Sequence, residues 1–283
     1  MIEFVLVPLT LVALSVAAYC DLRTREVPDW LSYGFLFAVI GIRVLFSFEE
    51  GWLMLVDGLL GFGVFYVLAL AFYYSRQWGG GDAKLLMGMG ALVGLSYPWG
   101  TETFHLPLFF VLLLVLGSVY GVAWLFGLAI VRRRVVWPAY QEMLAAYKKL
   151  VCGMLLLSIV LAGFSLVVPL LWLIAPLPFL LTVFLLFVSV MEKNCFHKKI
   201  DPIHATEGDW LYEAVCVGGK RVMEPKELQG ADLHRLVEWK KEKKISHIVV
   251  KEGVPFVPSF LIAYIAFLFL KDAAFSALFT LLH

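Results

Sequence analysis

The sequence predicts an all-α polytopic membrane protein of about eight transmembrane helices, with a small cytosolic α+β insert before the last helix. Of its 283 residues, 61% are hydrophobic and only 16% are charged. Several apolar runs exceed the roughly 18 residues that indicate a membrane-spanning helix. A soluble protein of this length does not need so much apolar surface. The net charge of +1 by itself says nothing about nucleic acid. We expect the lipid bilayer, and no nucleic acid, as a partner.

Each predicted span is a separate apolar stretch. The first has no Lys or Arg before residue 20 and no small-residue cleavage site after it, so we interpret it as a retained helix rather than a signal peptide. Pro169, Pro176 and Pro178 divide the stretch 150–191 into a helical hairpin, because proline removes a backbone donor and clashes with the preceding turn. The predicted spans are residues 2–20, 30–48, 52–74, 83–98, 107–131, 150–168, 173–191 and 255–279.

The distribution of basic residues predicts the orientation. Cytosolic loops carry an excess of Lys and Arg, and an N-terminus outside the cell places most of these residues on the cytosolic side. The same arrangement leaves Glu49, Glu50 and Glu102 in the outer loops. The basic residues assigned to the cytosol include Arg23, Arg25, Arg76, Lys84, Arg132, Arg133, Arg134, Lys148, Lys149 and those of segment 192–253.

Residues 192–253 form a polar and charged segment, long enough for a small domain. Within it, 211–217 and 220–223 flank Gly218-Gly219 and predict a β-hairpin. Residues 231–244 predict an amphipathic helix, and 246–251 a closing strand. We therefore divide the chain into a membrane part at 1–191, with a catalytic region at 19–90, a cytosolic α+β domain at 192–253 and a last helix at 254–283.

Two carboxylates at the predicted cytosolic boundary are the candidates for chemistry. Asp82 follows three glycines, Gly79, Gly80 and Gly81, at the start of the fourth span, and Asp21 ends the first. Acids at such positions cost free energy, and two that lie close share a proton, so that one activates water while the other polarises a carbonyl. Two structural alternatives stay open: a solvent-exposed acid for Asp21 and a helix N-cap for Asp82.

These residues resemble a known family. Asp21 with its following residues, and Gly79-x-Gly81-Asp82 with Lys84, closely resemble the prepilin and archaeal preflagellin peptidases, which are GxGD membrane aspartyl proteases, and more distantly presenilin. The resemblance extends to 206–211 and 253–258. It implies that Asp21 and Asp82 are the catalytic pair, supported by the glycine motif and Lys84, and that Pro255 to Pro258 lies near the site.

Two further acidic residues are candidates for substrate contact, and the Cys and His pattern bears on metal binding. Glu26 and Asp29 flank the proposed site, and we interpret them as candidates for contact with a basic leader peptide or as a solvated loop. The four cysteines form no CxxC pair, and the histidines lack ligand spacing, so we expect no metal and no cofactor. Without the paired CxxC motifs of bacterial members, N-methylation activity is not expected either.

Three functional hypotheses follow from the sequence. The first is an integral-membrane aspartyl endopeptidase that cuts the basic leader of prepilin- or preflagellin-type precursors at the cytosolic face of the cell membrane. The second is a presenilin-like protease that cuts inside a substrate helix. The third, from another class, is a transporter whose helix is broken at Gly79–Asp82. The sequence leaves the particular precursor and the oligomeric state open.

Overall fold

The computed structural model describes residues 1–75, 77–97, 101–226, 228–251 and 253–282, and Arg76 lies outside these ranges. The chain forms two compact units, one of Met1–Val122 with Val254–His283 and one of Ala123–Gly253. The predicted boundary at residues 191 and 192 falls inside the second unit, and the predicted three-part division stays a prediction.

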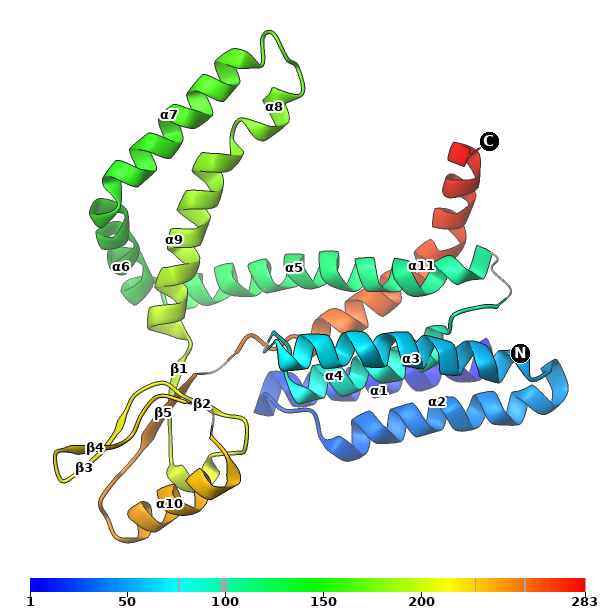
Figure 1. The fold of residues 1–283 in the computed structure, drawn as a ribbon, viewed down its shortest axis with the longest axis horizontal. Coiled ribbons are helices and arrows are strands. Elements are labelled where there is room, and N and C mark those ends of the chain that lie inside the picture. Colours follow the sequence, from blue (N-terminus) through cyan, green and yellow to red (C-terminus); the bar gives the residue numbers. More distant parts are fainter. Residues whose placement is uncertain (76, 98–100, 227, 252, 283) are drawn as a thin grey trace. The chain divides into compact units, whose positions relative to one another are not determined.

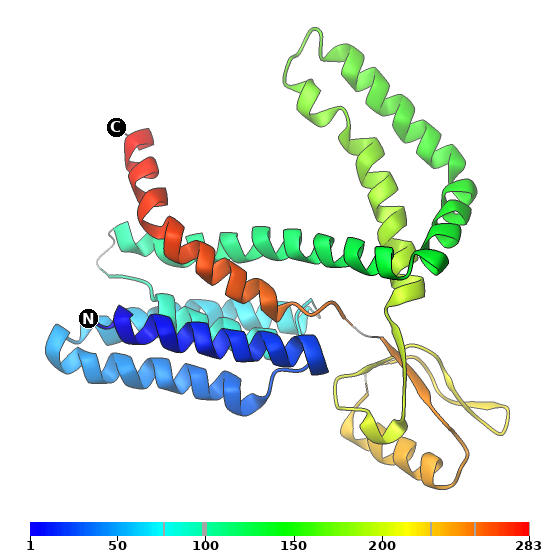
Figure 2. The ribbon, with the colours of Figure 1, turned by 180° about the vertical axis from the view of Figure 1, so that it is seen from behind.

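The first unit is helical. Its four N-terminal helices run side by side in Figures 1 and 2, and a 3₁₀ turn, η1 (Thr101–Phe104), leads from them into a long fifth helix. The C-terminal helix of the chain packs against the first one. The helices are α1 (Glu3–Thr24), α2 (Asp29–Glu50), α3 (Leu53–Tyr74), α4 (Gly80–Val93), the part of α5 (His105–Val131) up to Val122, and α11 (Val257–Leu282).

Helix α4 is the inner helix of this unit, and glycines let it approach α3 closely. It packs against α2 and α3, with Leu85, Leu86 and Met89 fully buried. A Cβ atom on Gly61 would strike the carbonyl oxygen of Gly90, and a Cβ on Gly90 would strike that of Gly61. Glycine costs about 1 kcal/mol inside a helix, so its presence on both sides of this contact indicates backbone-to-backbone packing, which is typical of membrane helices.

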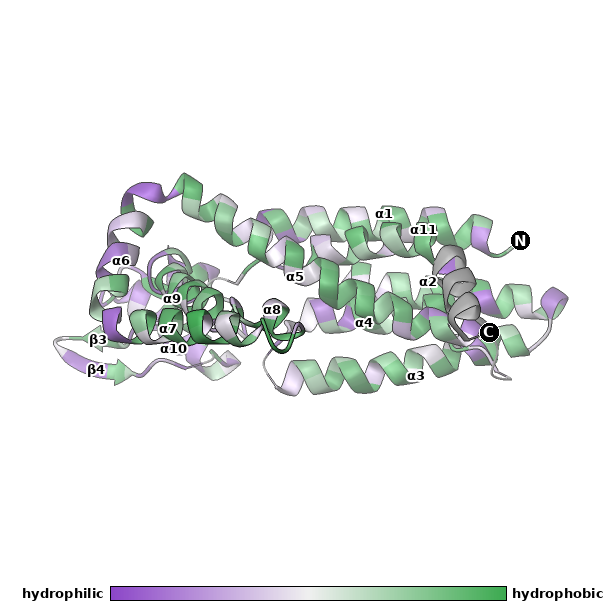
Figure 3. Ribbon diagram, turned by 90° about the horizontal axis from the view of Figure 1, so that it is seen from above, coloured by the Kyte–Doolittle hydropathy of each residue, from purple (hydrophilic) through white to green (hydrophobic). Residues whose placement is uncertain are grey.

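The helices identify a multi-pass membrane protein, but the predicted count of eight spans is not confirmed. Within the described residues, five helices are long and apolar enough to cross a membrane, and six if the bent pair α6 (Arg133–Ala146) and α7 (Lys148–Phe164) counts as one. Helix α4 has only 14 residues. The segment Val257–Lys271 of α11 is apolar but is also shorter than the candidate spans. Figure 3 shows how apolar residues dominate most of these helices. The predicted orientation stays a prediction.

The second unit begins with helices that the sequence predicted only in part. Helix α6, within a segment expected to be a loop, meets α7 at an angle of 76°. The short α8 (Leu171–Ile174) leads into α9 (Leu177–Cys195), whose N-cap is Pro176. Pro178 lies in the first turn of α9, where its missing N–H would have no intrahelical partner anyway. The predicted division of 150–191 by prolines is therefore observed.

The predicted α+β insert contains a small sheet and one helix. Strand β5 (Ile248–Lys251) lies between β1 (His197–Ile200) and β2 (Trp210–Leu211), with antiparallel pairing on both sides. Strands β3 (Val215–Val217) and β4 (Lys220–Met223) form the hairpin predicted at Gly218-Gly219, and both glycines have positive φ, as a two-residue turn of this kind requires. Helix α10 (Gly230–Lys241) buries Leu236 against the sheet.

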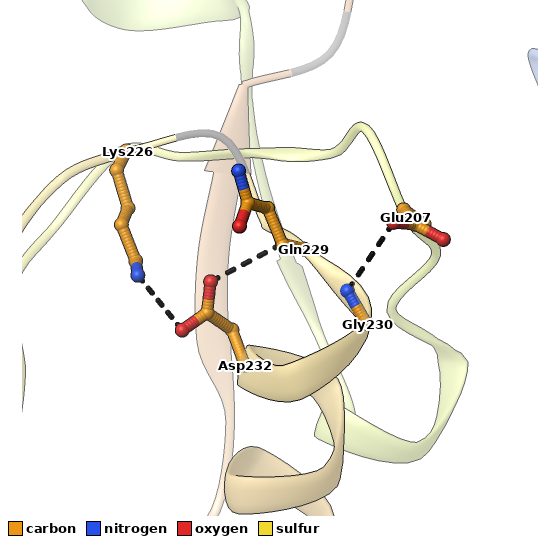
Figure 4. Close-up of polar contacts among 5 residues, drawn as sticks. All are labelled: Glu207, Lys226, Gln229, Gly230 and Asp232. Carbon is orange, nitrogen blue, oxygen red and sulfur yellow. Dashed lines mark hydrogen bonds and ion pairs between the residues drawn. The ribbon is translucent and has the colours of Figure 1, made fainter.

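Polar contacts fix the start of α10. Asp232 accepts a hydrogen bond from the Gln229 N–H (3.2 Å) and forms an ion pair with Lys226 (2.7 Å). Glu207 accepts a hydrogen bond from the Gly230 N–H (3.3 Å; Figure 4). These acids satisfy helix donors that would otherwise have no partner. In the neighbouring turn, the Asp209 carboxylate accepts from the Thr206 N–H at 2.8 Å. The motif at 206–211 therefore builds a turn and a helix cap.

Candidate active site

Asp21 lies on the last turn of α1 and is buried. Its side chain is only 7% exposed, which excludes the alternative of a solvent-exposed acid at the helix end. The carboxylate oxygen Oδ2 accepts a hydrogen bond of 2.9 Å from the backbone N–H of Val257, the first residue of α11. The first N–H groups of a helix have no intrahelical acceptor and favour a nearby negative charge. The carboxylate of Asp21 is therefore held by the N-terminus of a helix 236 residues further along the chain.

Asp82 lies in the first turn of α4. Gly79 is the N-cap residue, and Asp82 occupies the third helical position, where its Oδ2 accepts the Gly79 N–H at 3.3 Å. The residue is half-buried. Asp82 is thus not itself the N-cap that the structural alternative expected, although its carboxylate satisfies a backbone donor at the same helix end. A long single hydrogen bond leaves the other carboxylate oxygen available for chemistry.

The two carboxyl groups lie on different helices and interact electrostatically. Asp21 and Asp82 lie within electrostatic range of each other, and Asp21 acts on Asp82 as a like charge. Two neighbouring carboxyl groups do not ionise independently, because each charge disfavours the other. A pair in this state can remove a proton from water with the ionised member and donate a proton to a carbonyl oxygen with the protonated member.

An aromatic cluster connects the glycine motif to the start of α11. The ring of Trp78, directly before Gly79, stacks on Phe72 with a centroid distance of 4.6 Å. It also contacts Phe256 at 5.3 Å and Phe260 at 5.8 Å. Trp78 therefore packs between α3 and α11 and fixes the segment from which Asp82 projects. The same aromatic residues flank Val257, whose N–H holds Asp21.

The glycines of the motif have different surroundings. A Cβ on Gly81 would lie 3.1 Å from the Cβ of Val27, which is tighter than ordinary van der Waals contact. Gly79 and Gly80 meet nothing closer than 3.5 Å, and none of the three adopts positive φ. Gly81 is therefore needed for packing against the α1–α2 connection, whereas a Cβ on Gly79 or Gly80 would make only ordinary van der Waals contacts.

Of the other residues predicted for the site, some are exposed and some are buried beside Asp21. Lys84 forms an ion pair with Asp29 at the start of α2 and lies 5.0 Å from the centre of the Tyr33 ring. Asp29 is 68% exposed, and Glu26 is exposed as well. Pro255 and Pro258 are buried on either side of Val257, so the structure brings this predicted segment to Asp21.

Two further groups act on Asp21, and the sequence did not predict a role at the site for either of them. Arg25 follows α1 with a φ of +63°, which is uncommon for a residue other than glycine, and its positive charge acts on Asp21. Tyr120 on α5 also lies within electrostatic range of Asp21, and its hydroxyl oxygen is shielded from solvent. From the sequence, Arg25 was interpreted as a marker of orientation and as a neighbour of Asp21 in solvent. Tyr120 belongs to no motif, and the only sequence signal that could have found it is that it places a polar hydroxyl inside an apolar span.

Metal ligands do not gather at this site. Across the described ranges, no group of three or more His, Cys, Asp or Glu side chains converges as a metal site would require.

Comparisons with known proteins agree with this location. Residues 9–122, a range that includes Asp21 and Asp82, match the model of the type IV leader peptidase family. A preflagellin peptidase of Methanococcus maripaludis is 34% identical over 98 residues, which are 33% of this chain and 39% of the relative. A preflagellin peptidase of Methanocaldococcus jannaschii is 33% identical over 99 residues, 34% of this chain and 40% of the relative.

The chain thus spans about two fifths of the length of the curated relatives it matches. No solved structure matches it significantly. The resemblance to leader peptidases that the sequence motifs indicated is confirmed for the N-terminal part of the chain.

Proposed function

We propose that this protein is a membrane-embedded aspartyl endopeptidase that removes the basic leader of prepilin- or preflagellin-type precursors at the cytosolic face of the membrane. One observation carries the proposal: two carboxyl groups from separate apolar helices, Asp21 and Asp82, lie within electrostatic range inside the segment that matches the leader peptidase family. The names of the two relatives support preflagellin as the kind of substrate.

The proposed reaction needs only these two acids and water. The ionised carboxylate takes a proton from water, and the water oxygen attacks the carbonyl carbon of the scissile peptide. The protonated partner donates its proton to the carbonyl oxygen, which gives a neutral tetrahedral intermediate. The carboxyl group that took the proton from water then protonates the amide nitrogen, the other carboxylate takes a proton from a hydroxyl of the intermediate, and the C–N bond breaks. The Val257 N–H orients Asp21 for these steps by holding one of its oxygens.

The surface beside the pair suits a basic leader. Glu26 and Asp29 are exposed next to the segment that carries Asp21, and Asp29 is shared with Lys84. We propose that a lysine or arginine of the substrate contacts these carboxylates and competes with Lys84 for Asp29.

Co-expression of the full chain with a candidate preflagellin or prepilin tests the proposal, with cleavage followed as a mobility shift on a gel. We expect Asp82→Asn to insert normally and to abolish cleavage. Asp57→Asn is the matched control, because Asp57 is a carboxylate of the same helical unit that accepts the Tyr97 N–H away from the pair. Cleavage by Asp82→Asn at the rate of the unchanged protein would reject the catalytic pair.

Sequencing the new termini separates the remaining alternatives. A cut between the basic leader and the apolar segment agrees with the proposal, whereas a cut within the apolar segment indicates an intramembrane protease. Substrate-dependent flux into liposomes without any cleavage would instead indicate a transporter.

A further inference from the structure

The second unit contains a groove among three helices that the proposed function does not use. The end of α5, the first half of α6 and the middle of α9 enclose a cavity of about 570 Å³. This volume is within the usual range of small-molecule sites. Its walls are almost entirely apolar and aromatic, with Phe126 stacked on Phe187 at 5.2 Å and Tyr140 edge-on to Phe187 at 5.9 Å.

The groove has one charged group among its lining residues. Arg133, at the start of α6, lines it and is exposed. Within the part of the chain that the structure describes, no carboxylate forms an ion pair with Arg133. The two neighbouring arginines differ: Arg132 donates to the carbonyl of Cys195 at 3.1 Å, and Arg134 does not line the groove. The cavity thus combines an apolar interior with a single available cation.

The helix that carries Arg133 has the character of a membrane-surface helix. Helix α6 presents buried Val136 on one side and charged residues at its start, and the chain turns by 76° into the apolar α7. Trp137 lines the groove and is 61% exposed, and the Tyr140 hydroxyl donates to the Val183 carbonyl at 3.1 Å. Arginine, tryptophan and tyrosine together are typical of the boundary between lipid tails and headgroups.

The positive charge of Arg133 and the apolar walls of the groove together indicate which kind of ligand fits. A purely apolar ligand would leave the Arg133 guanidinium without an anion, and a small soluble anion would leave the aromatic walls uncovered. A membrane lipid with an acidic headgroup satisfies both parts, because its hydrocarbon chain fills the apolar walls and its phosphate accepts hydrogen bonds from arginine. We propose that the groove formed by α5, α6 and α9 is a binding site for one anionic phospholipid, with the phosphate on Arg133 and a hydrocarbon chain against the stacked rings of Phe126 and Phe187.

Native mass spectrometry of the purified full chain in detergent tests the site, with dioleoyl-phosphatidylglycerol and dioleoyl-phosphatidylcholine as probes of identical chain composition. We expect preferential retention of phosphatidylglycerol. Arg133→Gln lowers the affinity for this lipid about fivefold, the usual contribution of one basic residue near anionic lipid, and Arg133→Lys keeps the preference. Arg134→Gln is the matched control and changes the affinity less than twofold.

A second variant tests the apolar part independently. Ala129 lines the groove, so Ala129→Phe fills it and lowers the retention of both lipids, with folding checked by size-exclusion chromatography. Equal loss in Arg133→Gln and Arg134→Gln, or equal retention of the two lipids, overturns the site and indicates non-specific annular lipid. A lipid-free dimer that Ala129→Phe dissociates also overturns it, because a second copy of the chain then occupies the groove.

Discussion

Replacement of Asp21 separates the structural and the catalytic roles of one carboxylate. In Asp21→Asn, the amide oxygen still accepts the hydrogen bond from Val257 N–H, whereas in Asp21→Ala the acceptor is lost. Neither variant has an ionisable group at position 21, so Asp82 is left without a carboxyl partner. We therefore expect both variants to lose cleavage, and only Asp21→Ala to lose the connection between α1 and α11.

The magnitudes follow from the buried hydrogen bond. A buried donor left without a partner costs about 1–3 kcal/mol, and Asp21→Ala also removes packing at a site only 7% exposed. In Asp21→Asn, a charge-assisted bond becomes a neutral one at a cost of about 1 kcal/mol. Removal of the like-charge interaction with Asp82 offsets this cost. We expect the stability of Asp21→Asn to remain within about 1 kcal/mol of that of the unchanged protein.

Two measurements on the same purified samples check this prediction. Thermal unfolding in detergent is followed by tryptophan fluorescence, in which about 1 kcal/mol corresponds to roughly 2–4 °C for a chain of this size. Cleavage of a precursor is followed on a gel, and we expect a loss of at least about 10²-fold for both variants. Cleavage by Asp21→Asn within tenfold of the unchanged protein refutes the catalytic role. Identical melting temperatures for the two variants refute the structural one.

Three further perturbations test the aromatic cluster at Trp78, the contact between α3 and α4, and the polar contacts at the start of α10. Trp78→Ala removes three ring contacts worth about 0.5–1.5 kcal/mol each, so we expect kcat to fall with little change in KM in steady-state cleavage assays. Gly90→Val overpacks the α3–α4 contact and costs about 1–3 kcal/mol in thermal unfolding, whereas Gly34→Val, where a Cβ meets nothing within 4 Å, serves as its control. Lys226 holds the pKa of Asp232 below its usual range, so this pair stabilises α10 at neutral pH and the contribution is lost as the pH falls below about 4. Asp232→Asn should speed hydrogen exchange in α10 at pH 7 and remove this acid dependence.

Local patterns predicted most of the secondary structure. Apolar runs marked the positions of α1, α2, α3 and α5 because a bilayer requires continuous hydrophobic residues. The hairpin at Gly218-Gly219 was predictable because few residues other than glycine adopt positive φ at both turn positions. Strand β1 was missed because His197–Ile200 shows no period-two alternation of apolar and polar residues.

Helix α6 was missed for a related reason. Its sequence mixes arginines with apolar residues and contains Pro138, so a search for apolar runs assigns it to a loop. A helix at a membrane surface has apolar residues on one face only, and its pattern differs from that of a spanning helix. The groove that α6 helps to form could not be predicted, because its walls come from three helices whose packing no local pattern reveals.

The candidate site shows where sequence reasoning reaches its limit. The types and depths of Asp21 and Asp82 predicted their pairing, but the hydrogen bond from Val257 joins residues 236 positions apart. The family match ends at residue 122. The first segment of the first compact unit ends at the same residue, and its second segment begins at residue 254. The matched segment therefore contains both acids and lacks the helix N-terminus that orients Asp21. Since the aromatic contacts of Trp78 also reach Phe256 and Phe260, a catalytic unit made of residues 1–122 alone would contain both acids without the segment that holds them in place.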